Sequence, residues 1–236
     1  MPAAAVQKLQ ADLQAAAAPA KAAFFPRFFK AGPGEYAHGD RFLGVTVPVQ
    51  RALAKKYLAS ISLADIAALL HRPIHEERLP ALILLVGKFQ QAPAQTAIYQ
   101  LYLRHTAHIN NWDLVDASAA QIVGPYLVKR DRGILTTLTR SDSLWERRIA
   151  LIATFHFIKQ RHYATTLQIA SLLLHDPHDF IHKAVGWMLR EIGKRDRATL
   201  ETFLAPHYQT MPRTMLRYAI EHFRSPGRQR YLKGKI

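Results

Sequence analysis

The sequence predicts an all-α protein built from tandem helical repeats. Segments of roughly 10–18 residues with apolar residues at helical spacing follow one another along the chain, separated by Pro, Gly, Asn or Asp. A single strand candidate, residues 43–48 (LGVTVP), is too short and isolated to found a sheet. A charged position recurs every 35 residues, which is the spacing expected of stacked helix pairs.

The helical segments can be placed in order from their periodicity and punctuation. Ser143 and Glu146 have the spacing of a capping box, which marks one of the starts. Helices are expected to begin near Ala3, Lys21, Pro48, Leu63, His75, Ala94, Asn111, Lys129, Ser143, Tyr163, Asp179, Asp196 and Pro212.

The recurring charged position holds Arg78, Asp113, Arg148 and Lys183. The residues one and four places later are apolar in every case, so each charged residue stands near the start of a helix that faces a core. This period suits a helix-pair solenoid of the HEAT or TPR kind, whose equivalent helices line one concave face. We therefore expect tandem HEAT-like repeats that form a curved α-solenoid with a concave basic groove.

Composition indicates a folded protein with an anionic partner. The chain has 236 residues, is 49% hydrophobic and carries a formal net charge of +15. The apolar fraction excludes a disordered polycation, and the length suits a single domain over residues 1–236. Nucleic acid is the common partner of so basic a chain, although general basic solubility explains the charge equally well. Residues 129–236 hold 20 basic and 9 acidic side chains, so this half carries most of the excess.

Several classes of site are excluded or disfavoured. The chain has no cysteine, which excludes disulfides, thiolate zinc sites, iron–sulfur clusters and cysteine nucleophiles. His175, His178 and His182 cluster, but no further ligand completes a known metal spacing and HExxH is absent. We expect no metal and no cofactor. The longest apolar stretch, residues 79–87, is too short to span a bilayer, so a cytoplasmic protein without a membrane partner is expected.

Trp112 and Asp116 stand four residues apart and therefore share one helix face. A partly buried indole beside a helix-start carboxylate would explain them without any function. The equivalent helices of the next repeats carry Arg148 and then Lys183, Trp187 and Arg190. Stacked together, these side chains would form a basic groove with aromatic rings and one acid. Such a surface suits a sugar–phosphate backbone, with Arg and Lys on the phosphates.

The two aspartates are expected to differ in role. Asp113 occupies the recurring charged position, so neighbouring repeats would place it beside cations in a structural ion pair. Asp116 aligns instead with nonpolar residues, Ala81, Leu151 and Gly186. A carboxylate found in one repeat alone, within a cationic face, could stabilise positive charge on a substrate, as when a glycosidic bond breaks. Asp116 is the candidate catalytic residue.

The chain resembles the AlkD-type DNA alkylation repair glycosylases, which are built of HEAT-like repeats. The resemblance covers nearly the whole chain and rests on FLGVTVPVQR, NWDLVDASAAQIVG, SDSLWERRIALIATFHFIK, FIHKAVGWMLREIGK and MPRTMLRYAIE. It implies excision of N3- and N7-alkylated purines from duplex DNA by a monofunctional glycosylase, which leaves an abasic site. The family's catalytic aspartate falls on Asp116, its groove tryptophans on Trp112 and Trp187, and its phosphate-contacting arginine on Arg148.

The chain departs from the family pattern at two positions. Asn111 replaces the first of two tryptophans that often precede the aspartate, and Phe28 replaces a groove-facing tyrosine. The acid and both main indoles are retained, so activity is expected. Alkylated double-stranded DNA is the expected partner, of a nucleoid-associated monomer with no obligate protein partner. Lys183 is expected to assist Arg148 at the phosphates, and Arg190 to line the same groove.

Two rival functions stay open. A non-catalytic relative could bind distorted or branched DNA by shape, although the retained Asp116 and Trp187 argue against it. A helical scaffold for protein partners would be expected to present an apolar or acidic ridge instead of a cationic one.

The tail, residues 224–236, is basic and holds no acid. It is either a frayed terminus or an arm that touches DNA.

Overall fold

The computed structural model describes residues 4–93 and 95–236, and it confirms the all-α fold. Within these residues the only β pairing is one isolated parallel bridge between Arg41 and Ile74. None of the helices described is long and apolar enough to cross a membrane. The chain groups into two compact units, residues 1–118 and 119–236. The expectation of one domain over the whole chain stays a prediction.

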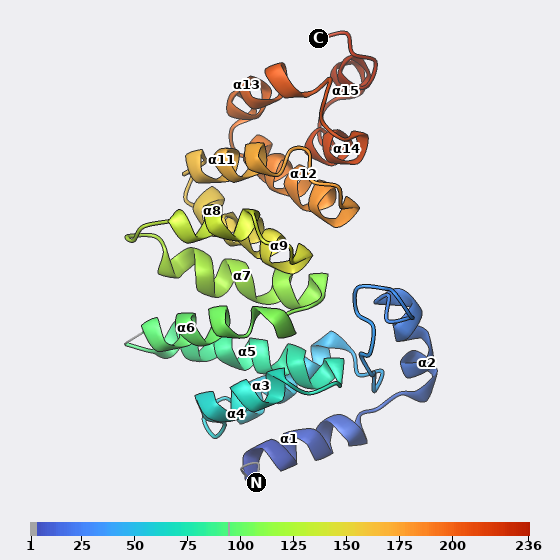
Figure 1. Cartoon of the computed structure of the whole chain (residues 1–236), viewed down its shortest axis with the longest axis vertical. Helices are drawn as coiled ribbons and strands as arrows, with labels where there is room; N and C mark the ends of the chain where they lie inside the picture. Colours follow the sequence, from blue (N-terminus) through green and yellow to red (C-terminus); the bar gives the residue numbers. More distant parts are fainter. Residues whose placement is uncertain (1–3, 94) are drawn as a thin grey trace. The chain divides into compact units, whose positions relative to one another are not determined.

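The first unit is organised around its longest helix, α5, which packs against α1, α3, α4 and α6. The apolar run that follows the charged first turn of α5 supplies its buried face. The helices of this unit are α1 (Ala4–Ala15), α2 (Pro19–Phe28), α3 (Val47–Tyr57), α4 (Leu63–Leu70), α5 (His75–Gln91), α6 (Thr96–Arg104), the short 3-10 helix η1 (Thr106–His108) and the start of α7 (Trp112–Tyr126) (Figure 1). The starts expected near Ala3 and Ala94 lie outside the described residues.

The strand candidate at residues 43–48 forms no strand, because this segment is a loop held by a buried carboxylate. Glu76 is fully buried and accepts the backbone N–H groups of Leu43 at 3.0 Å, Gly44 at 2.8 Å and Val45 at 3.3 Å. These amides therefore need no neighbouring strand. Val47 and Pro48 instead begin α3, where the fixed φ of proline suits a first turn.

The second unit is organised around α12, which packs against α9, α13 and α14. Gly186 allows the close approach of α12 to α14, since a Cβ atom there would lie 2.4 Å from the Cβ of Tyr218 and 2.5 Å from the carbonyl oxygen of Met215. The helices are the end of α7, α8 (Gly133–Thr139), α9 (Leu144–Ala153), α10 (Phe155–Lys159), α11 (Ala164–Leu172), α12 (Asp179–Gly193), α13 (Arg197–His207), α14 (Arg213–Ala219) and α15 (Ser225–Leu232). The sequence patterns predicted neither α10 nor α15.

The repeat register agrees with the helices. Arg78, Asp113, Arg148 and Lys183 fall in the first two turns of α5, α7, α9 and α12 respectively. The expected cap of α9 is formed by Ser143, whose hydroxyl accepts the N–H of Glu146. The Glu146 carboxylate itself accepts a hydrogen bond from the Ser141 hydroxyl at 2.5 Å. Tandem helical repeats are thus the architecture of the chain.

Candidate active site

The start of α7 is held in place by side chains of its own first residues. Asn111 is fully buried, and its Oδ1 accepts the N–H of Trp112 at 2.8 Å while its Nδ2 donates to the Phe29 carbonyl at 3.4 Å. Asp113 Oδ1 accepts the N–H of Leu114 at 2.9 Å. These bonds satisfy amides that have no partner within the helix. An indole has no acceptor and could not replace Asn111 in this role.

A buried histidine on α5 binds the first turn of α7. His75 is 1% exposed, and its Nε2 lies 2.8 Å from Oδ2 of Asp113. Its Nδ1 lies 3.6 Å from Oδ2 of Asp40, beyond a normal hydrogen bond, so these two groups interact as an ion pair. Asp40 also pairs with Arg78, three residues after His75 on the same face of α5. Two anions and two cations thus form one charge cluster inside the first unit.

The cluster keeps the imidazole protonated. Burial alone would favour neutral His75, but the negative charge and hydrogen bond of Asp113, together with Asp40, outweigh this and raise the pKa of His75 to about 9. Burial of Asp40 acts against its ionised form, yet contacts with His75 and Arg78 hold the pKa of Asp40 below its ordinary value. His75 is therefore a cation at neutral pH, and it holds Asp113 as its counter-ion.

Aromatic rings fix the orientation of Trp112. Phe29 stacks on the indole with ring centroids 5.9 Å apart, and Phe28 meets it edge-on at 6.0 Å. Phe29 also stacks on His75 at 4.7 Å, which joins the indole to the charge cluster. Phe28 is 49% exposed, whereas Phe29 is buried. The structure thus brings together Trp112 and Phe28, two of the predicted site residues, at the surface of the first unit.

Asp116 follows Trp112 by one helical turn and is partly exposed. Burial, and to a smaller extent the negative charge of Asp116, raise the pKa of Tyr102, so the Tyr102 hydroxyl stays protonated. That hydroxyl lies 3.1 Å from Ser118 Oγ, which in turn donates to the Leu114 carbonyl at 2.6 Å. Tyr102 and Ser118 therefore support the turn of α7 that carries Asp116.

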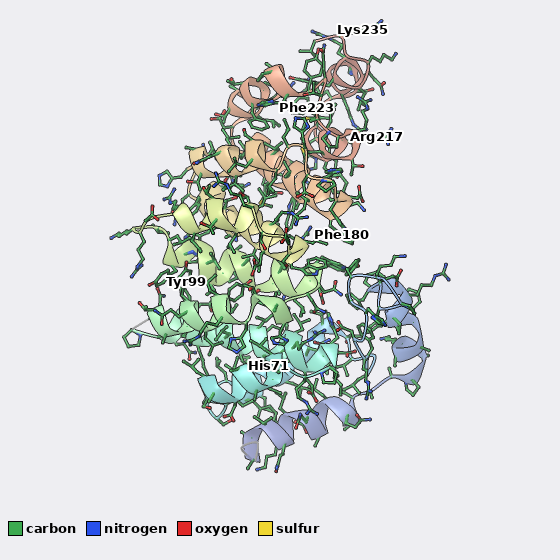
Figure 2. The ribbon with its side chains drawn as sticks, viewed as in Figure 1. His71, Tyr99, Phe180, Arg217, Phe223 and Lys235 are labelled. Atoms are coloured by element: carbon green, nitrogen blue, oxygen red, sulfur yellow. The ribbon has the colours of Figure 1, made fainter. Side chains whose placement is uncertain are left out.

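The remaining predicted site residues belong to the second unit. Arg148 is 5% exposed and donates from Nη1 to the Phe180 carbonyl at 2.8 Å, and Lys183 Nζ lies 5.5 Å from the Phe180 ring centre. Phe180, labelled in Figure 2, is thus the common neighbour of both cations. Lys183 pairs with Asp179 at 2.6 Å, at the exposed start of α12.

The last two predicted residues lie further along α12. The Trp187 ring is half-buried, with its centroid 5.8 Å from that of Phe155. Arg190 pairs with Glu221. Lys183, Trp187 and Arg190 therefore all lie on α12, and their role at a DNA groove stays a prediction.

Comparison with known proteins places the chain in a family. Residues 9–223 match the family described as DNA alkylation repair enzyme. The chain belongs to this DNA alkylation repair family. Its fold is also similar to that of the solved structure "Predicted DNA alkylation repair enzyme from Enterococcus faecalis", with a TM-score of 0.68 and 20% identity over 88% of this chain and 96% of that chain. A comparison with curated proteins found no match.

Membership of the DNA alkylation repair family implies a role in that repair and binding to DNA. The formal net charge of the chain, +15, agrees with a DNA partner. Within the described residues no group of three or more His, Cys, Asp or Glu side chains could hold a metal ion. Two of the clustered histidines cap backbone instead: His178 accepts the N–H of Phe180, and His182 bonds to the Asp176 carbonyl.

Sequence reasoning about this DNA alkylation repair protein missed the support beneath the site. His75, Asp40 and Phe29 were not among the predicted site residues, yet they hold Asp113 and Trp112. One signal was present: HEER, residues 75–78, places four titratable side chains directly before the longest apolar run. So many charges at the edge of a buried helix require buried partners.

Proposed function

We propose that the chain is a monofunctional DNA N-glycosylase that hydrolyses the glycosidic bond of N3- and N7-alkylated purines in duplex DNA and leaves an abasic site. One observation carries this proposal: Trp112 and Asp116 share a face of α7, and the first turn of that helix is fixed by Asn111, by the His75–Asp113 pair and by stacked aromatic rings. Fixed side chains favour catalysis because their orientation is set before the substrate binds.

The chemistry needs one carboxylate. An alkylated purine is already cationic and leaves with the glycosidic electron pair as a neutral base, so no strong acid is required. The sugar then carries oxocarbenium-like positive charge, which Asp116 would stabilise while it orients the attacking water and accepts its proton. Most glycosidases use two carboxylates. Asp113 does not supply the second, because it is the counter-ion of buried, protonated His75.

The proposed DNA contacts come from both units. Trp112 with Phe28, and Trp187, would pack on deoxyribose, and their π faces also favour a nearby cation. Arg148, assisted by Lys183, would bind the flanking phosphates, and Arg190 would line the same surface. Lys183 pairs with an exposed carboxylate, Asp179. Since exposed ion pairs contribute only about 0–1 kcal/mol, a phosphate can displace such a partner.

The decisive experiment measures release of 7-methylguanine and 3-methyladenine from methylated duplex DNA by the wild type and by Asp116→Asn. We expect the variant to lose roughly 10²–10³-fold in single-turnover rate, the range seen when a preorganised electrostatic group is removed. Its DNA affinity should be equal or higher, because a negative charge is removed. Asp142→Asn is the matched control: it removes an exposed carboxylate outside α7 and should leave release unchanged.

The outcomes separate the rival functions. Undiminished release by Asp116→Asn would contradict the catalytic role of Asp116. If the wild type releases no base but binds branched duplexes tightly, the chain is a non-catalytic DNA-binding relative. If the wild type shows no DNA binding of the kind that weakens steeply with salt, a protein scaffold is the better account.

A further inference from the structure

Residues 224–236 form an ordered part of the second unit. α15 packs through Tyr231, which is 5% exposed and meets the rings of Tyr208 and Phe223 at centroid distances of 5.4 and 5.5 Å. The Tyr208 hydroxyl donates to the Ile236 carbonyl at 2.9 Å, so the last residue is also held. These contacts exclude a frayed end and give the basic side chains of this segment defined positions.

The carbonyl groups at the end of α15 already have partners. Gly234 adopts φ +68°, which lets Gly234 N–H bond to the Tyr231 carbonyl at 3.2 Å and Lys235 N–H to the Arg230 carbonyl at 2.9 Å. This is the Schellman pattern of helix ends. The Leu232 carbonyl accepts from Arg213 Nη2 at 2.7 Å. The cationic side chains near this end are therefore not needed as helix caps.

Three cations, Arg230, Lys233 and Lys235, surround this helix end and form what we call the C-terminal cationic surface. All three are exposed, and none forms an ion pair with any residue that the structure describes. Arg230 lies in the last turn of α15 and Lys233 is the residue that follows the helix, and the Schellman turn brings Lys235 back to Arg230. Lys235 extends beyond the end of α15 (Figure 2).

The two acidic side chains that precede this segment in the sequence are already paired. Glu221 pairs with Arg190, and Glu201 pairs with Arg197 at 2.9 Å. Residues 222–236 contain no acidic side chain. Three cations that are held in place and form no ion pairs are suited to binding a regular row of anions. Because their backbone is already ordered, binding costs less conformational entropy.

We propose that the C-terminal cationic surface binds backbone phosphates of duplex DNA and so contributes an additional contact to the substrate complex. This rests on the proposed function, which supplies duplex DNA as the partner. The contact is independent of base identity and of alkylation, because phosphates carry no sequence information.

The test uses an undamaged duplex, so that binding is measured separately from base release. The triple variant Arg230→Gln, Lys233→Gln, Lys235→Gln is compared with the wild type across a salt series. We expect roughly tenfold weaker binding at low salt, and a salt slope reduced by about 0.9 for each phosphate that the variant no longer binds, up to about 2.7 for three. A second triple variant, Arg230→Lys, Lys233→Arg, Lys235→Arg, keeps the charge and should bind like the wild type.

A location control removes the same charge elsewhere. Lys8, Arg104 and Lys129 are exposed and form no ion pair within the described part of the chain. Their triple change to Gln should reduce the salt slope by less than the change at the C-terminal cationic surface. Equal effects of the two neutralised triples would overturn the proposal and leave only a general effect of net charge.

Binding to anionic vesicles tests the other source of phosphate groups. If the C-terminal variant keeps wild-type DNA affinity but loses binding to vesicles of anionic phospholipid, the surface recognises lipid headgroups and the proposal is wrong. Thermal unfolding of each variant establishes that the fold is intact, since the three side chains are exposed. Failure of the proposed function gives a different result: the wild type itself then releases no base, whatever salt slope the variants show.

Discussion

His75 Nε2 and Asp113 Oδ2 lie 2.8 Å apart inside the first unit and join the start of α5 to the start of α7. The pair lies directly beside Trp112, which precedes Asp113 and stacks on the same phenylalanine as His75. The residues proposed to perform chemistry are therefore supported by a buried ion pair. Breaking such a pair by removal of one partner is far more damaging than loss of a surface pair.

Asp113→Asn should lower the free energy of unfolding by about 3–5 kcal/mol, because it leaves buried, protonated His75 without its main counter-ion. Urea denaturation measures this change. Glu201→Gln, which breaks the exposed pair with Arg197 within α13, is the control and should cost about 0.3–0.5 kcal/mol. Equal losses in the two variants would contradict a buried ionic role for Asp113.

The same pair predicts how stability depends on pH. The pKa of His75 is raised from 6.5 to about 9, so between these values the folded state holds a proton that the unfolded state has released. Stability from this group is full below pH 6.5 and is lost as pH rises through about 9. This pKa difference corresponds to about 3 kcal/mol in the free energy of unfolding.

Urea denaturation of the wild type and of His75→Gln at pH 6, 8 and 10 checks this prediction. The difference in unfolding free energy between the two proteins should shrink as the pH rises. Parallel pH profiles would show that His75 does not carry the proton. If the difference in unfolding free energy shrank instead as the pH fell, the pH dependence would have the opposite sign and the raised pKa would belong to another group.

The sequence predicted the helices better than the contacts between them. Spacing alone placed the starts of α4, α5 and α12 at Leu63, His75 and Asp179. The same rules offered a strand candidate at residues 43–48, which forms a loop and the start of α3, because the partner of the amides of residues 43–45, Glu76, lies more than thirty residues away in sequence.

The period of 35 shows a similar limit. It pointed to cations beside Asp113 in neighbouring repeats, and the structure places α5 beside Asp113 but with His75 in contact, one turn before Arg78. Periodicity identifies which helix faces a residue. It does not predict which turn of that helix makes the contact, because this depends on the packing of rings such as Phe29 between the helices.

A second histidine group responds to pH in the opposite direction. His71, His105 and His108 cluster in the first unit, with the His71 and His108 ring centroids 3.9 Å apart. Burial, then the charges of the other two histidines and of Arg78, lower the pKa of His108. Below pH 6.5 the unfolded state binds a proton that folded His108 resists, so stability falls as the solution becomes more acidic.

His71→Gln removes one source of repulsion and should raise the pKa of His108, which an NMR titration of the imidazole resonances measures directly. The variant should also lose less stability than the wild type between pH 7 and 5. His38→Gln, which removes a histidine outside the cluster, provides the control and should leave the His108 titration unchanged. A His108 titration that is the same in His71→Gln and the wild type would show that the rings do not interact.

Phe28 and Phe24 provide a matched pair for testing the aromatic side of the site. Both are exposed on α2, at 49% and 55%, but Phe28 meets the Trp112 indole edge-on at 6.0 Å, while Phe24 is in ring contact with Phe28. Phe28→Ala should change stability by no more than about 1 kcal/mol, because truncating an exposed ring removes little buried area.

Base release should nevertheless fall in Phe28→Ala, since the ring both orients Trp112 and extends the apolar surface offered to deoxyribose. Removal of one such stacking ring costs about 1–3 kcal/mol, or roughly 5–150-fold in kcat/KM. Phe24→Ala should lie within about twofold of the wild type on the same methylated duplex. If both variants lose activity equally, the exposed face of α2 acts as a whole, and the contact between Phe28 and Trp112 has no special part in positioning the indole.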